Sequence, residues 1–139
     1  MRNLTPFLLC ILAAAFLPLA CSGPSNTPEG VAKAFFEQIM IKGDVDAVMK
    51  LIELPDKDDS KNAGLEDMVR GKMSAGIQQE KERAGKNGGV SNIAVEKTDI
   101  DAKDPNFARV HVLINYKNGQ QRKDDVRVVK TDKGWKVRI

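Results

Sequence analysis

The hydrophobic pattern changes its period near the middle of the chain, and the first half has the period of a helix. There the apolar residues recur every three or four positions, as in a helix that buries one face. Thr27 can cap a first helix, Pro28 suits its first turn, and Gly43 is typical of its end. Asp44 can cap a shorter second helix that closes before Pro55. The pattern therefore predicts two helices joined by a tight turn.

A third helix and then a run of strands are predicted beyond this pair. The third helix is expected over Leu65–Ala84, although Gly71 and Gly76 lower its helix propensity. After this helix apolar and polar residues alternate, which is the period of a strand. The predicted strands cover Val90–Ile100, Phe107–Lys117, Gln121–Lys130 and Trp135–Ile139. Asn118 and Gly119 predict a two-residue type I′ turn between the second strand and the third.

Helices that precede an antiparallel meander are typical of the α+β class. We therefore expect a single domain over residues 27–139, in which the N-terminal helices pack on one face of a curved antiparallel sheet. The apolar candidates for its core, or for the wall of a pocket, are Val31, Phe35, Ile39, Val110, Val112, Tyr116 and Trp135. Trp135 follows Gly134 at the start of the last strand, where we expect its ring to staple the sheet to the first helix rather than to stack on a ligand.

The first 20 residues form a segment unlike the rest of the chain. They hold one charged residue, Arg2, and an apolar run of 14 residues, Phe7–Ala20. A spanning helix needs about 20 apolar residues, so this run is too short to cross a bilayer. A short positive start followed by such a run is typical of a secretory signal peptide. Residues 1–20 are therefore predicted to be removed from the mature protein.

The apolar run ends in Leu17-Pro18-Leu19-Ala20-Cys21, which resembles the lipobox of bacterial lipoproteins. The resemblance implies that Cys21 carries a diacylglyceryl thioether and an acylated amine, and more than one acyl chain anchors a protein stably. Ser22 in the next position resembles sorting to the outer membrane of Gram-negative bacteria. Residues 21–26 are then a lipidated tether that keeps the domain within about 20 Å of the bilayer. The alternative is an ordinary signal peptide that leaves Cys21 as a free thiol.

The charge of the predicted mature chain is nearly balanced. Without the first 20 residues, 21 basic and 19 acidic side chains remain, which gives no electrostatic footprint for nucleic acid. The predicted C-terminal hairpins carry Arg122, Lys123, Arg127, Lys130, Lys133, Lys136 and Arg138. Such a stripe can meet anionic lipid headgroups or another polyanion, but charges on exposed strands also protect sheet edges from pairing. We favour protection, because Trp135 is the only aromatic residue that alternates with these charges.

Two stretches at the ends of the predicted domain resemble a known family. They are Pro28-Glu29-x-Val31-Ala32 with Phe35 and Lys42-Gly43-Asp44, and Val128-Val129-Lys130 with Gly134-Trp135-Lys136-Val137. They resemble small bacterial lipoproteins with a domain of unknown function, of the lumazine-binding-like fold in the nuclear transport factor 2-like (cystatin-like) group. The resemblance implies a cone in which a bent antiparallel sheet wraps a long helix, often with a pocket at the open end. It implies no reaction, because fold and function are separable.

Candidate catalytic and metal-binding groups are few. The only histidine, His111, lies in the second predicted strand on the face opposite Val110 and Val112. We expect it to be exposed; as an alternative it could act as an acid or base if that face lined the pocket. One histidine and a lipidated cysteine do not predict a zinc site. The loop over Asp56–Asp67 spaces its oxygens as a calcium loop does, but Lys61 replaces the glycine that the turn requires. We therefore predict no metal and no cofactor.

Three functional hypotheses remain open. The first is a non-enzymatic module on the periplasmic face of the outer membrane, held there by lipid on Cys21, which binds a small apolar ligand or an envelope protein. The second is a small enzyme that uses His111 as acid or base in the pocket. The third is a purely structural envelope protein. We favour the first, in which the protein is not an enzyme and does not bind nucleic acid.

Overall fold

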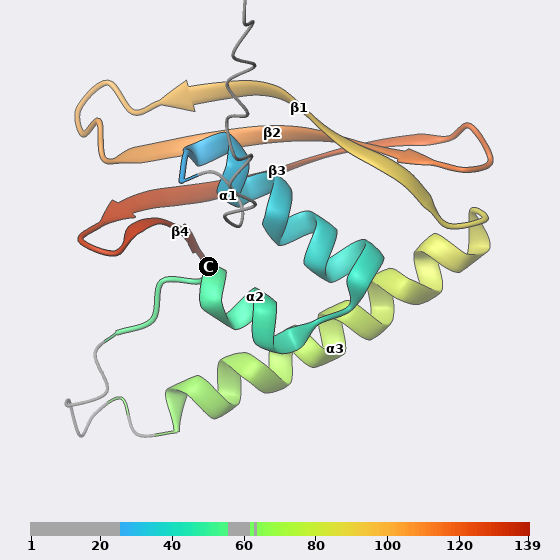
Figure 1. The fold of residues 1–139 in the computed structure, drawn as a ribbon, viewed down its shortest axis with the longest axis horizontal. Helices are drawn as coiled ribbons and strands as arrows, with labels where there is room; N and C mark the ends of the chain where they lie inside the picture. Colours follow the sequence, from blue (N-terminus) through green and yellow to red (C-terminus); the bar gives the residue numbers. More distant parts are fainter. Residues whose placement is uncertain (1–25, 56–61, 63) are drawn as a thin grey trace, which may run out of the picture.

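The computed structural model describes residues 26–55, 62 and 64–139, and within them it confirms the predicted α+β class (Figure 1). The helical segments are α1 (Pro28–Glu37), the π-helix η1 (Gln38–Lys42), α2 (Val45–Leu51) and α3 (Leu65–Lys86). The strands are β1 (Val90–Ile100), β2 (Phe107–Tyr116), β3 (Gln121–Thr131) and β4 (Gly134–Arg138). Each of the described helices is too short or too polar to cross a membrane.

The first helix starts as predicted but does not remain an α-helix. Thr27 Oγ1 accepts a hydrogen bond from Gly30 N at 3.0 Å, and Pro28 occupies the first turn. At Gln38 the winding widens into η1, which ends with a hydrogen bond from Gly43 N to Gln38 O at 2.7 Å. A π-turn holds one more residue than an α-turn, and hydrophobic periodicity does not reveal it. The expected uniform helix is therefore wrong over η1, whereas Gly43 ends it with a left-handed φ of 65° as predicted.

The second helix connects the helical layer to the edge of the sheet. Asp44 caps α2 as predicted, because its Oδ1 accepts a hydrogen bond from Ala47 N at 3.1 Å. The helix ends at Leu51, and the chain then runs along β4. Glu53 N donates to Val137 O at 2.8 Å, so the backbone beyond the helix is satisfied by the sheet edge.

The sheet has the strand order β1-β2-β3-β4, with each neighbouring pair antiparallel. The β2–β3 turn differs from the predicted two-residue form. Tyr116 N donates to Gln120 O at 2.9 Å, which leaves a three-residue loop that ends at Gly119, with φ of 88°. A tertiary contact accompanies this form, because Asn118 Nδ2 donates to Asn87 Oδ1 at 3.0 Å beyond the end of α3. The sequence of the turn gives no sign of this contact, because Asn87 lies 31 positions earlier in the chain.

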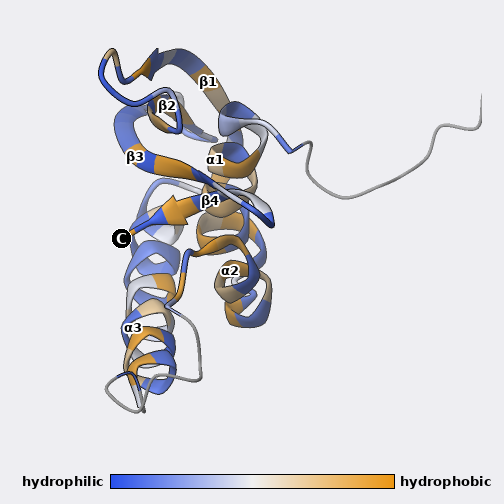
Figure 2. Cartoon of the chain, turned by 90° about the vertical axis from the view of Figure 1, so that its left-hand side faces the viewer, coloured by the Kyte–Doolittle hydropathy of each residue, from blue (hydrophilic) through white to orange (hydrophobic). Residues whose placement is uncertain are grey.

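The core lies between the inner face of the sheet and α1, and Figure 2 shows hydrophobic residues where α1 and the strands meet. The largest fully buried side chains are Ile114, Val48, Val110, Val112, Val128 and Val137. The predicted alternation of β2 is confirmed, since its even-numbered residues are the buried ones. Of the candidates for core or pocket wall, Val31, Phe35, Val110, Val112 and Tyr116 are buried, while Ile39 and Trp135 are half-buried against the same core.

The third helix stands apart from the sheet. It packs on η1 and α2 and makes few contacts with the strands. In Figure 1 its C-terminal half approaches the start of β1, whereas its N-terminal half extends away below α2. This position leaves room between α3, η1 and β3, and the candidate site lies there.

Candidate functional site

The candidate site is a cleft of about 170 Å³ between α3, η1 and β3, which we call the α3 cleft. Its apolar wall comes from Phe36 of α1, Ile39 and Met40 of η1, and Met73 and Ile77 of α3. Met73 and Ile77 are one helical turn apart, so both lie on the face of α3 that packs toward η1. The π-turn supplies two of these wall residues, and π-turns occur often at functional sites.

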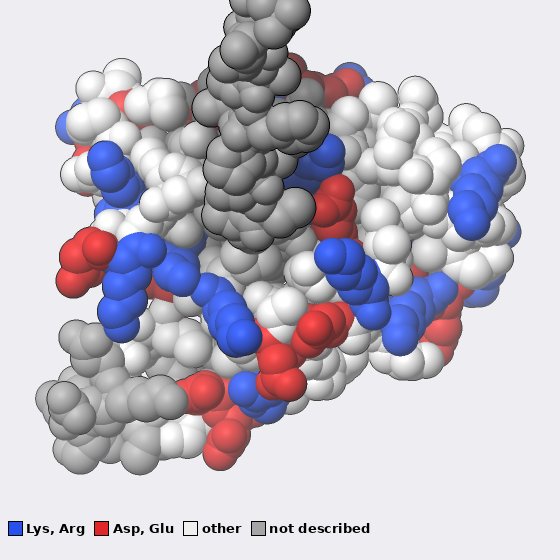
Figure 3. All heavy atoms as spheres, in the orientation of Figure 1, with Lys and Arg blue, Asp and Glu red and all other residues white. Residues whose placement is uncertain are grey.

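A half-buried ion pair forms the polar wall of the α3 cleft. Arg122 of β3 donates from Nη1 to Glu80 Oε2 of α3 at 3.1 Å, and from Nη2 to Asp124 Oδ2 at 3.2 Å. The side chains of Arg122 and Glu80 are only 25% and 19% exposed. The buried Nε of Arg122 has no hydrogen-bond partner within the described part of the chain, and such a group is costly unless something satisfies it. Figure 3 shows acidic and basic side chains intermixed along α3, and the pair of Arg122 and Glu80 joins α3 to the sheet across the cleft.

Gly76 gives the α3 cleft part of its opening. It lies in the middle of α3 and lines the cleft, and a Cβ added there would meet no atom within 4 Å. A mid-helix glycine costs about 1 kcal/mol relative to alanine. Packing among the described residues therefore does not require glycine here, and a larger side chain at this position would enter the cleft.

The structure places the candidates for core or pocket wall mostly in the core. Only Ile39 of the seven lines the α3 cleft. Val31, Phe35, Val110, Val112 and Tyr116 belong to the core. Trp135 lies at the start of β4, where its backbone N donates to Asn26 Oδ1 at 2.8 Å.

Sequence reasoning missed Met40, Met73, Gly76, Glu80 and Arg122 as site residues. A signal for Arg122 was present, because it shares the alternation phase of Val126 and Val128, which face the core. A charged residue in the buried phase of a strand needs a partner, and its partner is Glu80. Met40 and Met73 carry no comparable signal, since they read as ordinary members of apolar helix stripes.

His111 lies on the outer face of the sheet, opposite Val110 and Val112 as predicted, but it is half-buried there rather than exposed, and it does not line the α3 cleft. Its Nε2 is 2.9 Å from Asp99 Oδ2, and Lys97 Nζ is 2.8 Å from Asp99 Oδ1. The hydrogen bonds from Lys97 and then from His111 hold the pKa of Asp99 below its usual value. The cluster of Lys97, Asp99 and His111 is a surface network across β1 and β2.

Asp99→Asn is expected to destabilise the protein at neutral pH and to lose this effect in acid. A carboxyl whose pKa is lower in the folded chain stabilises the fold above its unfolded pKa, here near 3.8. That contribution disappears as the pH falls through the lower, folded pKa. Urea unfolding at pH 7 and below pH 3 measures the difference between variant and wild type. If the difference in unfolding free energy between variant and wild type stays constant across this pH range, the lowered pKa of Asp99 is contradicted.

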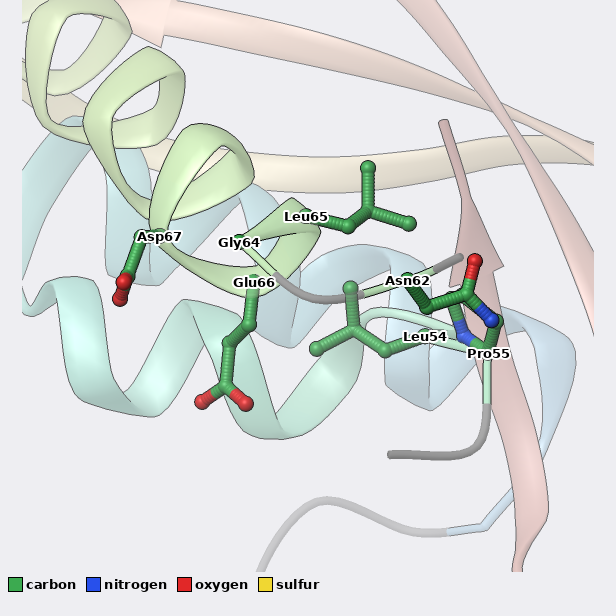
Figure 4. Close-up of a pocket in the computed structure, with 7 residues that line it drawn as sticks. All are labelled: Leu54, Pro55, Asn62, Gly64, Leu65, Glu66 and Asp67. Atoms are coloured by element: carbon green, nitrogen blue, oxygen red, sulfur yellow. The ribbon is translucent and has the colours of Figure 1, made fainter. Parts of the chain in front are cut away.

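A second hollow, of about 250 Å³, lies at the start of α3 (Figure 4). Leu54 and Leu65 contribute apolar side chains to it, and the Glu66 and Asp67 carboxylates lie beside it. Pro55, Asn62 and Gly64, which line it, adjoin in sequence the residues that the structure does not describe, so we do not treat it as the site.

Several predicted features lie outside the described residues. They are the signal peptide over residues 1–20, Cys21 with the tether up to residue 25, and most of the acidic loop compared with a calcium site. Within the described ranges, no group of histidine, cysteine, aspartate and glutamate side chains could hold a metal ion.

Comparison with known proteins adds two findings. Residues 19–138 match the family profile of a domain of unknown function, DUF4878. The crystal structure of a Campylobacter jejuni protein, proposed to be an NTF2-like transpeptidase, superposes with a TM-score of 0.68 and 26% sequence identity, and the match covers 81% of this chain and 98% of that one. No curated protein matches the chain.

Proposed function

Because the chain belongs to the family of the domain of unknown function DUF4878 and has an NTF2-like fold, we propose that it is a lipid-anchored binding module of the cell envelope. In this role, lipid on Cys21 holds the protein at the periplasmic face of the outer membrane. The α3 cleft binds an apolar group and performs no reaction on it. The lipobox-like residues before Cys21 support the anchor, and the α3 cleft supports the binding role.

The single observation that carries the binding role is an open apolar cleft crossed by an ion pair. The α3 cleft has a volume of about 170 Å³, and an engineered apolar cavity of about 150 Å³ in another protein binds benzene. The space therefore suits one ring or one branched aliphatic group. Such a group could belong to a small apolar ligand or be an anchoring side chain of an envelope protein. Arg122, Glu80 and Asp124 would orient the polar atoms beside it.

The name of the Campylobacter jejuni protein raises a transpeptidase role, which requires a nucleophile beside a base. In the described residues the ring of His111 contacts Asp99, and no serine, threonine or cysteine side chain is hydrogen-bonded to it. His111 also faces away from the α3 cleft. These positions favour binding over a reaction that uses His111.

Gly76→Leu is expected to close the α3 cleft and leave the fold intact. The Cβ of a leucine at this position would meet no atom within 4 Å. Leucine also favours the helix by about 0.8 kcal/mol relative to glycine. The probe is indole, a ring the size of one side chain. In protein labelled on its methionine methyl groups, indole should shift the Met40 and Met73 signals and spare those of Met49 and Met68. In Gly76→Leu these shifts should disappear.

The matched control is Gly71→Leu. Gly71 is an exposed glycine of the same helix, outside the α3 cleft, and it too has open space at its Cβ position. This variant should gain similar helix stability and still bind indole. Indole binding that survives Gly76→Leu unchanged, or that shifts Met68 as much as Met73, would contradict the proposed binding role.

A further inference from the structure

We propose that one edge of the domain docks on the anionic headgroups of the leaflet that holds the anchor. This edge, which we call the lysine face, consists of Lys50 at the end of α2, Lys133 in the β3–β4 turn and Lys136 of β4. The inference rests on the lipid anchor proposed above. It adds a fixed orientation of the domain on the membrane, with the phosphate-bearing headgroups as the docking partner.

The first described residue lies beside the lysine face. Trp135 N donates to Asn26 Oδ1 at 2.8 Å, and a Cβ added to Gly134 would lie 2.5 Å from Asn26 Nδ2. Asn26 therefore sits against the first residues of β4. It follows Cys21 by five residues, so an extended chain separates the two by at most about 18 Å. Lipid on Cys21 would hold this edge of the domain nearest to the bilayer.

The lysine face carries a net positive charge. It borders a shallow hollow of about 590 Å³ between the end of α2 and the β3–β4 turn, and among the described residues the carboxylates lining this hollow are Glu53 and Asp132. Glu53 Oε2 is paired with Arg138 Nε at 3.3 Å, so Asp132 is the carboxylate that faces the three lysines of this hollow. Lys136 Nζ donates to the Lys50 carbonyl oxygen at 2.6 Å, so α2 and β4 are joined at this point. Figure 3 shows basic side chains gathered over the end of α2 and β4.

The three lysines suit the headgroup region of a membrane. An ammonium group near an anionic surface is attracted to it within a Debye length. Trp135 precedes Lys136 in β4, is half-buried against the core and is the only tryptophan of the chain, so it provides a single fluorescent probe near the lysine face.

The test adds the protein, purified from membranes with its lipid, to preformed vesicles that contain a lipid with a nitroxide on its headgroup. Trp135 fluorescence should be quenched in vesicles of phosphatidylcholine with phosphatidylglycerol, and much less in phosphatidylcholine alone. Lys50→Gln with Lys133→Gln should lower the docking equilibrium about 25-fold, or about fivefold per lysine. Lys136 is kept, because it also joins β4 to α2.

The control variant is Lys86→Gln with Lys117→Gln, which removes the same charge near the β2–β3 turn at the opposite end of the sheet (Figure 1). Trp135 fluorescence in this variant should be quenched as strongly as in the wild type. Equal quenching with and without phosphatidylglycerol, or equal losses in the two double variants, would overturn the docking. The mass of the same sample separates the two proposals: acylated Cys21 with unquenched Trp135 overturns the docking alone, and unacylated Cys21 overturns both.

Discussion

Ile114→Ala is expected to lower the free energy of unfolding by about 3 kcal/mol, which is a large part of the stability of a small domain. Ile114 has no exposed surface and lies in β2 between Ile93 of β1 and Arg122 of β3. Truncation removes buried apolar area and leaves a cavity that close-packed neighbours fill only in part. Urea unfolding followed by circular dichroism measures the loss.

Two variants make this expectation specific to the inner face of the sheet. Ile114→Val should cost about 1 kcal/mol. Leu113→Ala, on the half-buried outer face of the same strand, should cost less than Ile114→Ala. Because Ile114 pairs with Arg122 of the α3 cleft, its truncation should also weaken indole binding. Equal losses for Leu113→Ala and Ile114→Ala would contradict the core described above.

Local signals made most of the fold predictable from the sequence. Thr27, Gly43 and Asp44 act on neighbouring backbone groups, and the alternation along β2 depends only on strand geometry. The π-turn and the three-residue hairpin loop escaped prediction. They accompany contacts between segments that are distant in sequence, namely the packing of η1 on α3 and the side-chain contact between Asn118 and Asn87.

The candidate site was less predictable, because it depends on where α3 stands relative to the sheet. Its residues come from four elements, α1, η1, α3 and β3, and only Ile39 belonged to the predicted set. The phase of Arg122 along β3 was a readable signal, since a charged side chain in line with Val126 and Val128 requires a buried partner. Periodicity cannot show that Gly76 faces an opening, because glycine lowers helix propensity wherever it lies in a helix and whatever surrounds it.

Cys21→Ala is expected to move the protein from the membrane fraction to the soluble part of the envelope. The substitution removes the sulfur that would carry the lipid. The remaining apolar run, Phe7–Ala20, is too short to span a bilayer even if it is not cleaved. Fractionation of native cells measures the distribution, and the mass of the wild-type protein should correspond to a chain that begins at an acylated Cys21.

Cys10→Ala is the matched control, because it changes a cysteine inside the predicted leader. It should leave both the membrane fraction and the mature mass unchanged, since Cys10 is removed with residues 1–20. Retention of Cys21→Ala in the membrane pellet would contradict anchoring through Cys21, and a wild-type mass with an unmodified Cys21 would favour the ordinary signal peptide. The α3 cleft could still bind an apolar group in that case, but the lysine face would lose the tether that brings it to the headgroups.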